Sequence, residues 1–165
     1  MSNFIFLALF SSLVCLGCLN AQKEKTEEDD IVYLVTKSES QWKALLSPEA
    51  FYVLRKAGTE KPFTGKYDKH YQEGTYHCAG CLAPLYESKH KYDSGTGWPS
   101  FDQGIDSNIE LGEDYLLGYR REELKCSQCG GHLGHRFDDG PKETTGQRHC
   151  INSVALEFKP KEINE

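Results

Sequence analysis

The cysteines of this 165-residue chain divide into closely spaced pairs and one isolated residue. Six of the seven cysteines have C-x-x-C spacing, whereas Cys150 stands alone in the segment "GQRHCINSVALEF". Paired cysteines are typical of metal sites or disulfides. An isolated cysteine is often a small buried hydrophobic residue, but it can also be a nucleophile. The residues around Cys150 therefore decide between packing and chemistry.

Charged and polar residues suited to thiol chemistry accompany Cys150. Arg148 and Asn152 lie two positions before and after it, so on a β-strand all three side chains share one face. A guanidinium this close stabilises a thiolate and lowers the pKa of the thiol, and an amide can donate hydrogen bonds to it. The segment "GHLGH" adds His132 and His135, the natural proton donors near neutral pH, framed by glycines that allow close approach. The alternatives are a core thiol for Cys150 and metal-binding or surface roles for the histidines.

An aromatic residue, Trp98, stands in the segment "GWPSF". Beside Pro99 it forms a rigid apolar plate. The alternative interpretation is ordinary core packing, which is the commoner role of a tryptophan.

Two C-x-x-C pairs lie in the body of the chain, "CAGC" with Cys78 and Cys81 and "CSQC" with Cys126 and Cys129. Two such turns on either side of a long insert are typical of a tetrahedral four-cysteine site, and Zn²⁺ is the expected metal. Iron and disulfides are the alternatives. If a metal holds these four thiols, Cys150 is the only free thiol of the predicted domain.

The elements that position these residues are predicted to be mostly strands. The segments "SESQWKALL" and "SPEAFYVLRKAG" predict two short helices, the second capped by Ser47, started by Pro48 and ended by Gly58. From Thr64 on, helical periodicity stops, and glycines and aromatic residues recur in short runs. The alternation over residues 148–158 predicts one strand that carries Cys150. The expected class is mainly β with short helices at the front.

The overall composition is that of an ordinary globular domain, with 38% hydrophobic and 27% charged residues. The length fits one domain with an appendage. The net charge of −6 argues against nucleic acid and against an anionic membrane as partners.

The first residues differ from the rest. The run "FIFLALFSSLVCLGCL" at residues 4–19 carries no charge and is shorter than the roughly 20 residues of a membrane span. It predicts a secretory signal, with a buried N-terminal helix as the alternative. The step Gly17-Cys18 resembles a bacterial lipoprotein cleavage site, at which Cys18 would be lipidated, and cleavage near Ala21 is the alternative.

These features divide the chain into a signal peptide of lipoprotein type at 1–18, a polar acidic linker at 19–37 and a catalytic domain at 38–165. The linker is too polar to bury a core. We expect an exported protein, periplasmic or membrane-anchored, that touches the membrane only through a lipid.

Several segments together resemble the B-type methionine-R-sulfoxide reductase family over about Ser38–Lys159. They are "PFTGKY", "CAGC", "YDSGTGWPSF", "CSQCGGHLGHRFDDGP" and "RHCINSVALEF". The resemblance implies two small antiparallel sheets with short N-terminal helices and one structural zinc ion at the four cysteines.

The resemblance also implies a role for each candidate residue. Cys150 would attack the sulfur of methionine-R-sulfoxide in oxidised proteins and become a sulfenic acid. His132 and His135 would hold and protonate the sulfoxide oxygen, and Trp98 would support the methyl group of the substrate. Arg148 and Asn152 would tune and orient the thiolate. A thioredoxin-like protein or a small-molecule thiol would then reduce the enzyme.

Two positions depart from the family pattern. His149 replaces a common tyrosine, but its side chain should face away from Cys150. Thr96 stands where many members carry a resolving cysteine, so we expect an outside thiol to reduce the sulfenic acid directly. The alternative class is a zinc-binding chaperone or GTPase-contact module, which would not need these residues around Cys150.

Overall fold

A computed structural model describes residues 32–162 of the chain. In this part, two helices precede nine short strands. The helices are α1 (Glu39–Leu45) and α2 (Pro48–Lys56). The strands are β1 (Gly74–Cys78), β2 (Pro84–Glu87), β3 (Lys91–Tyr92), β4 (Ser100–Phe101), β5 (Ile109–Asp114), β6 (Arg121–Cys126), β7 (His132–Phe137), β8 (Arg148–Ile151) and β9 (Leu156–Pro160). Neither helix in residues 32–162 could span a lipid bilayer. The predicted signal peptide lies outside the described residues.

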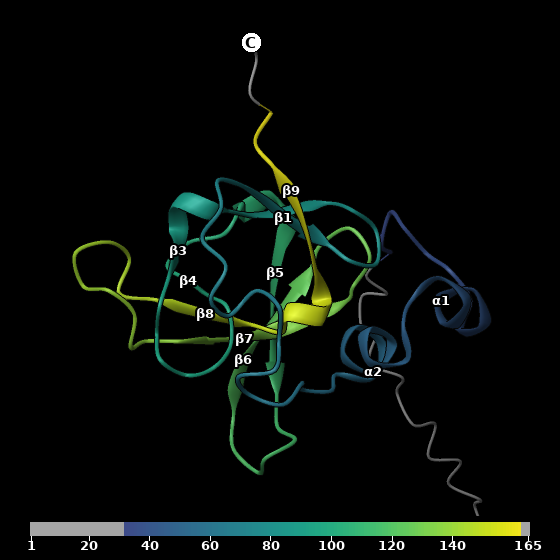
Figure 1. The fold of residues 1–165 in the computed structure, drawn as a ribbon. Helices are drawn as coiled ribbons and strands as arrows, with labels where there is room; N and C mark the ends of the chain where they lie inside the picture. The colour runs from purple at the N-terminus through teal and green to yellow at the C-terminus, as the bar shows by residue number, and fades with distance from the viewer. Residues whose placement is uncertain (1–31, 163–165) are drawn as a thin grey trace, which may run out of the picture. The chain divides into compact units, whose positions relative to one another are not determined.

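The strands form two antiparallel sheets (Figure 1). The smaller sheet has the order β2-β1-β9, and the larger has the order β3-β4-β8-β7-β6-β5. Helix α2 packs against β7 and against a short 3₁₀ turn, η3 (Ser153–Ala155). The prediction of a mainly β fold with two antiparallel sheets and short N-terminal helices is confirmed.

The second helix begins as the sequence predicts. The Ser47 hydroxyl accepts a hydrogen bond from the Ala50 N–H at 3.1 Å, and Pro48 occupies the first position of α2. The helix ends one residue earlier than expected, because Ala57 takes the left-handed conformation with φ 52°. Burial of Val53 and Leu54 directs one face of α2 into the core, which stabilises the short helix far more than its own propensity does.

The single strand predicted over residues 148–158 is wrong, because the chain changes sheets at this point. Strand β8 ends at Ile151, η3 follows, and β9 pairs with β1 in the smaller sheet. The buried carboxylate of Glu60 accepts hydrogen bonds from the N–H groups of Ser153 and Val154 at 2.6 and 3.0 Å. These N–H groups therefore satisfy their hydrogen bonds in a turn and do not extend the ladder of β8.

Candidate active site

Cys150 lies in a pocket of about 120 Å³ on the larger sheet. Among the described cysteines, it is the only one outside the four-cysteine group. The pocket brings Cys150 together with three other predicted site residues, Trp98, His135 and Asn152. Its remaining walls are Thr59, Arg121, Gly134, Phe137 and Ile151. The structure thus gathers residues from five separate segments around one thiol.

The register of β7 and β8 places a histidine beside the thiol. His135 is the direct cross-strand partner of Cys150, and side chains in such positions stand about 4.5–5.5 Å apart at their Cβ atoms. A Cβ added at the neighbouring Gly134 would collide with the backbone carbonyl of Cys150. Gly134, which lacks a Cβ, therefore lets β7 and β8 pair closely beside Cys150, as the glycines of this segment were expected to do.

Burial controls the ionisation of the thiol. Desolvation raises the pKa of Cys150, although the charge of Arg148 and hydrogen bonds from Thr96 and Arg148 act to lower it. Arg148 thus lowers the pKa of the thiol as expected, but burial raises it by more. Arg148 also forms a bidentate ion pair with Asp139 at 2.8 and 3.0 Å, which weakens its field at the sulfur. Near neutral pH the resting thiol is mostly protonated.

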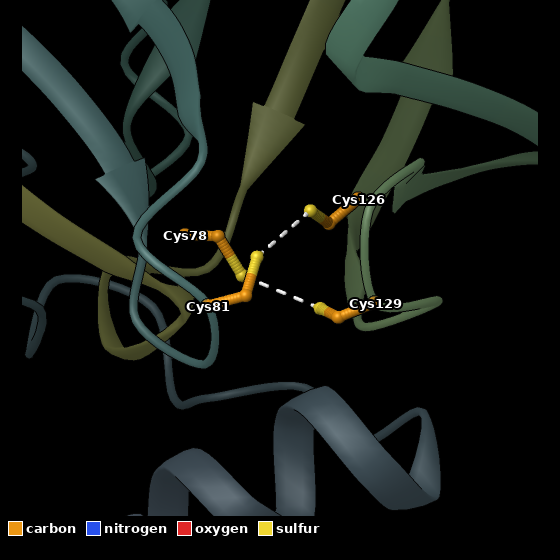
Figure 2. A group of neighbouring side chains, drawn as sticks. All are labelled: Cys78, Cys81, Cys126 and Cys129. Atoms are coloured by element: carbon orange, nitrogen blue, oxygen red, sulfur yellow. Dashed lines mark hydrogen bonds between the residues drawn. The ribbon is translucent and has the colours of Figure 1, made fainter. Parts of the chain in front are cut away.

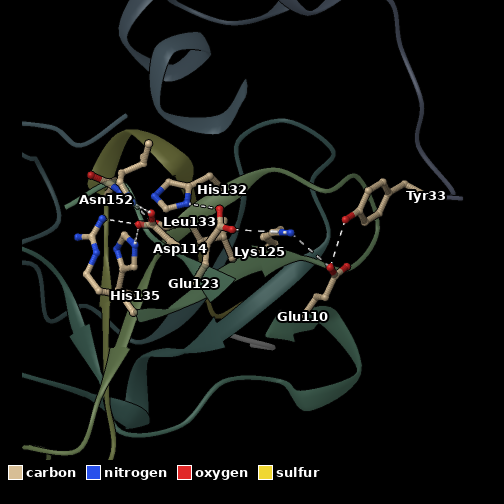
Figure 3. Close-up of polar contacts among 11 residues, drawn as sticks. Tyr33, Glu110, Asp114, Glu123, Lys125, His132, Leu133, His135 and Asn152 are labelled. Atoms are coloured by element: carbon tan, nitrogen blue, oxygen red, sulfur yellow. Dashed lines mark hydrogen bonds and ion pairs between the residues drawn. The ribbon is translucent and has the colours of Figure 1, made fainter. Parts of the chain in front are cut away.

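Each of the two predicted histidines pairs with a carboxylate (Figure 3). His135 Nε2 lies 2.7 Å from Asp114, and His132 Nδ1 lies 2.7 Å from Glu123. Burial lowers the pKa of His135, against the opposing effect of Asp114, so its imidazole is neutral near pH 7. A carboxylate that holds one ring nitrogen fixes the tautomer and leaves the other nitrogen for proton transfer.

A β-bulge brings the two histidines to the same side of the sheet. Gly134 pairs with Leu124 and His132 pairs with Lys125, so Leu133 is an extra residue on β7. In a regular strand, residues three apart face opposite sides. With the bulge, the rings of His132 and His135 lie 5.2 Å apart. His132 stands behind His135 and does not line the pocket, and its Nε2 is buried with no partner in the described part of the chain.

Two charged residues of the site, Arg121 and Asp114, were not predicted from the sequence. They are cross-strand partners on β6 and β5. Arg121 lines the pocket, and its guanidinium donates a hydrogen bond to the carboxylate of Asp114. The same carboxylate bonds His135. Burial opposes ionisation of Asp114, but hydrogen bonds from Leu116 N–H and His135 and the charge of Arg121 keep its pKa low. The alternation of charge at Arg121, Glu123 and Lys125 along β6 is the sequence signal that could have located this face.

The backbone of Glu60, which lies outside the sheets, hydrogen-bonds both Trp98 and Asn152. The Trp98 Nε1–H donates to the Glu60 carbonyl at 3.1 Å, and the Glu60 N–H donates to the Asn152 side-chain oxygen at 2.9 Å. The Asn152 amide nitrogen donates to the Leu133 carbonyl at 2.9 Å. Both polar atoms of Asn152 therefore bond backbone groups, so its contacts position the end of β8 and the bulge of β7.

Glu60→Ala is expected to lower the free energy of unfolding by about 3 kcal/mol, because the buried N–H of Ser153 and the partly buried N–H of Val154 lose their acceptor at about 1–3 kcal/mol each. Urea denaturation monitored by circular dichroism measures the change. Glu73→Ala is the control, because that carboxylate is 79% exposed in its ion pair with Lys161 and should change stability by less than about 0.5 kcal/mol. Equal effects of the two substitutions would contradict the role assigned to Glu60.

The four paired cysteines converge as the sequence predicts (Figure 2). Their sulfur atoms all lie within 4.8 Å of one another, with Cys78–Cys129 at 3.7 Å and Cys81–Cys126 at 3.5 Å. Metal–sulfur bonds of about 2.3 Å in a tetrahedron require sulfur atoms about 3.8 Å apart. The four thiols are free rather than disulfide-bonded, so their positions fit a tetrahedral metal ion.

The four-cysteine group connects the two sheets. Cys78 ends β1 of the smaller sheet, and Cys126 ends β6 of the larger one. Arg55 from α2 donates to the Cys129 carbonyl at 2.9 Å, and the Val35 N–H donates to the Gln128 carbonyl at 2.8 Å. None of the four cysteines lines the Cys150 pocket. This placement fits a structural metal.

Known proteins resemble this chain over most of its length. The SelR domain model matches residues 46–160. The chain is 53% identical over 129 residues to the peptide methionine sulfoxide reductase MsrB of Chromohalobacter salexigens. The aligned region covers 78% of this chain and 97% of that protein. It is 49% identical over 128 residues to peptide methionine sulfoxide reductase B5 of Arabidopsis thaliana. This aligned region covers 77% of this chain and 91% of that protein.

A pocket with one free cysteine beside a histidine–carboxylate pair is that of an enzyme with a cysteine nucleophile. The domain match and the relatives identify the group more closely: the chain belongs to the SelR family of B-type methionine sulfoxide reductases.

Proposed function

We propose that the chain reduces the R epimer of methionine sulfoxide in oxidised proteins to methionine. The observation that carries this proposal is the pocket in which Cys150 lies with Trp98 and His135. A sulfoxide has an electrophilic sulfur, a basic oxygen and an apolar methyl group. The thiol, the imidazole and the indole of this pocket match these three parts in turn.

In the proposed reaction, the sulfur of Cys150 attacks the sulfoxide sulfur. The sulfur–oxygen bond of the substrate breaks and oxygen passes to Cys150, so the thiol becomes a sulfenic acid while the sulfoxide becomes a thioether. The thiol is oxidised by two electrons and the substrate is reduced by two.

His135 is placed to move the proton. Its Nε2–H is held by Asp114, so Nδ1 of the neutral ring can accept the thiol proton as Cys150 attacks. The resulting imidazolium is stabilised by Asp114 and can protonate the departing oxygen. The His132–Glu123 pair lies directly behind and contributes a second polar ring to this wall.

The remaining predicted residues act on the thiol or the substrate. Arg148 favours the thiolate during attack, since it lowers the pKa of Cys150 against burial. Trp98 supplies the apolar plate for the methyl group, held by its bond to the Glu60 carbonyl. Asn152 orients the thiol through the backbone groups that it bonds.

The four-cysteine group is proposed to hold one Zn²⁺ ion. Cys78, Cys81, Cys126 and Cys129 would be its ligands, and the bound ion would supply structural cross-linking of the two sheets. Four soft thiolates in a tetrahedral arrangement are the donor set that zinc prefers, and iron is the alternative that elemental analysis distinguishes.

An outside thiol is proposed to regenerate the enzyme. Two thiol molecules reduce the sulfenic acid to the thiol and leave as a disulfide and water. In this proposal the four clustered cysteines hold the metal, and Thr96, which lowers the pKa of the Cys150 thiol against burial, has no sulfur. A thioredoxin-like protein or a small-molecule thiol can serve as the reductant.

Stoichiometric sulfoxide without reductant is expected to leave a dimedone-reactive Cys150 and no internal disulfide, as measured by peptide mapping. Thr96→Cys should instead yield a disulfide between the introduced thiol and Cys150, because Ser94 hydrogen-bonds both Thr96 and Ser100, the cross-strand partner of Cys150. Gly95→Cys, at an exposed neighbouring position, is the control and should form little of that disulfide. A disulfide between Cys150 and any other cysteine of the wild-type chain would contradict direct reduction by an outside thiol.

Separated epimers test the proposed function. With dithiothreitol as reductant, the wild type should reduce N-acetylmethionine-R-sulfoxide and leave the S epimer essentially unchanged, as followed by chromatography of both products. Turnover of the S epimer alone would contradict the assignment. Absence of turnover with either epimer would favour the zinc-containing binding module.

For residues 1–31, which the structure does not describe, we propose export as a lipoprotein. The uncharged run before Gly17-Cys18 supports this proposal. Mass spectrometry of the protein from its native membranes should find a chain that begins at Cys18 and carries lipid. A chain that begins near Ala21 would support export without an anchor, whereas a soluble chain that retains Met1 would contradict export.

A further inference from the structure

The hairpin between β5 and β6 carries an unusual exposed turn (Figure 1). The Gly118 N–H donates to the Tyr115 carbonyl at 2.9 Å, and Gly118 has φ 81°. Leu116 and Leu117 are therefore the two central residues of the turn, with exposures of 72% and 61%. Glycine, asparagine, aspartate, proline and serine usually fill such positions.

Two exposed tyrosines extend the apolar surface on either side of the leucines. Tyr115 and Tyr119 are each 59% exposed, so five residues of one loop present four large apolar or aromatic side chains to solvent. We call residues Tyr115–Tyr119 the apolar loop. A single exposed leucine is unremarkable, but a contiguous group of this kind is typical of an interaction site.

The apolar loop borders the catalytic pocket. Asp114, which immediately precedes the loop, accepts a hydrogen bond from the Leu116 N–H at 2.7 Å and also holds His135 and Arg121 in the pocket wall. Tyr115 and Leu116 line a groove of about 460 Å³ together with Ala57.

This groove and the Cys150 pocket are neighbours at two separate points. Ala57 of the groove is two residues from Thr59 of the pocket, and Asp114 of the groove bonds the pocket residues His135 and Arg121. Material bound in the groove would therefore continue toward Cys150.

The charges of the groove are already neutralised by partners within the chain. Glu113 bonds Arg120 at 2.7 Å and Tyr115 at 2.8 Å. Glu123 bonds His132 and lies 3.7 Å from the ammonium group of Lys125. The carboxylates of the groove are thus paired within the chain, and Ala57, Tyr115 and Leu116 supply its apolar surface.

We propose that the apolar loop binds apolar side chains next to the oxidised methionine in an extended polypeptide substrate. This inference rests on the proposed reduction of methionine sulfoxide. Methionine is commonly buried among other apolar residues, which become accessible when an oxidised protein unfolds. The pocket would take the sulfoxide while the groove and loop take a neighbouring leucine or phenylalanine, so apolar neighbours of the sulfoxide are preferred over polar ones.

Matched peptides test the proposal with the full chain. One peptide carries a single methionine-R-sulfoxide flanked by leucine and phenylalanine, and the other has the same length and charge but is flanked by serine and glycine. We expect kcat/KM to be about tenfold higher for the apolar peptide, the effect of burying part of one large side chain. N-acetylmethionine-R-sulfoxide, too short to reach the loop, measures the chemistry alone.

The double variant Leu116→Ser/Leu117→Ser should reduce the preference to less than about twofold. Serine keeps the N–H that bonds Asp114 and suits a turn. Leu34→Ser is the control, because this leucine is 83% exposed and lines neither the groove nor the pocket. It should keep the tenfold preference.

The other outcomes separate this proposal from the function on which it rests. Turnover of N-acetylmethionine-R-sulfoxide without any preference between the peptides overturns the docking proposal alone, whereas no turnover of that compound overturns the proposed function. Retained preference in the double variant also overturns the docking proposal. The docking proposal is also overturned if the double variant keeps the peptide preference and loses only self-association, measured by sedimentation, because the loop would then contact a second copy of the chain. The same holds if the variant loses only binding to phosphatidylcholine–phosphatidylglycerol vesicles, because the loop would then contact a membrane.

Discussion

Cys150→Ser is expected to lower kcat/KM for N-acetylmethionine-R-sulfoxide by at least about 10³-fold. A serine hydroxyl is far less nucleophilic than a thiol toward sulfur and cannot form a sulfenic acid, so the covalent route is lost. The half-buried position tolerates serine, because the change replaces one small side chain with another. Initial rates with dithiothreitol over a range of substrate concentrations measure the loss.

The matched control for this variant is His149→Gln. His149 is adjacent in sequence, faces the opposite side of β8 and contacts Tyr86 rather than the pocket. Burial, with the charge of Arg136, lowers the pKa of His149 to about 4, so the ring is already neutral at pH 7 and glutamine removes no charge. We expect activity within about twofold of the wild type. Full activity of Cys150→Ser would mean that another group performs the oxygen transfer.

Loss of the metal site is expected to unfold the domain. A structural zinc site contributes about 10 kcal/mol or more to folding in zinc-finger peptides. That is comparable with the whole stability of an ordinary domain, about 5–15 kcal/mol. Cys126→Ser removes one of the four clustered thiols at the junction of the two sheets, so we expect a largely unfolded, metal-poor protein. Far-ultraviolet circular dichroism and elemental analysis measure fold and metal content.

Cys150→Ser serves as the control here too, because its thiol stands outside the four-cysteine group. It should retain one zinc ion per chain and the wild-type spectrum. The wild type should lose its fold when a strong chelator extracts the metal. A metal-free wild type that stays folded and active would show that the four thiols are not a structural metal site.

The sequence by itself determined the parts that depend on local patterns and on the chemistry of single residues. The spacing of the two C-x-x-C pairs predicted the four-cysteine group, because a tight turn directs two thiols the same way. Ser47 and Pro48 predicted the start of α2, because capping is satisfied within a few residues. The motifs around Cys150 were specific enough to indicate the family.

The tertiary structure alone decided how the predicted site residues meet. The break after Ile151 depends on the carboxylate of Glu60, which is 93 residues from Ser153 in the chain. The bulge at Leu133 depends on the register with β6, and it turns His132 and His135 to one side. The pKa of Cys150 depends on burial, which raises it by more than the charge of Arg148 lowers it, and only the arginine is visible in the sequence. Each of these arises from contacts between segments distant in sequence, whose geometry and desolvation no local pattern encodes.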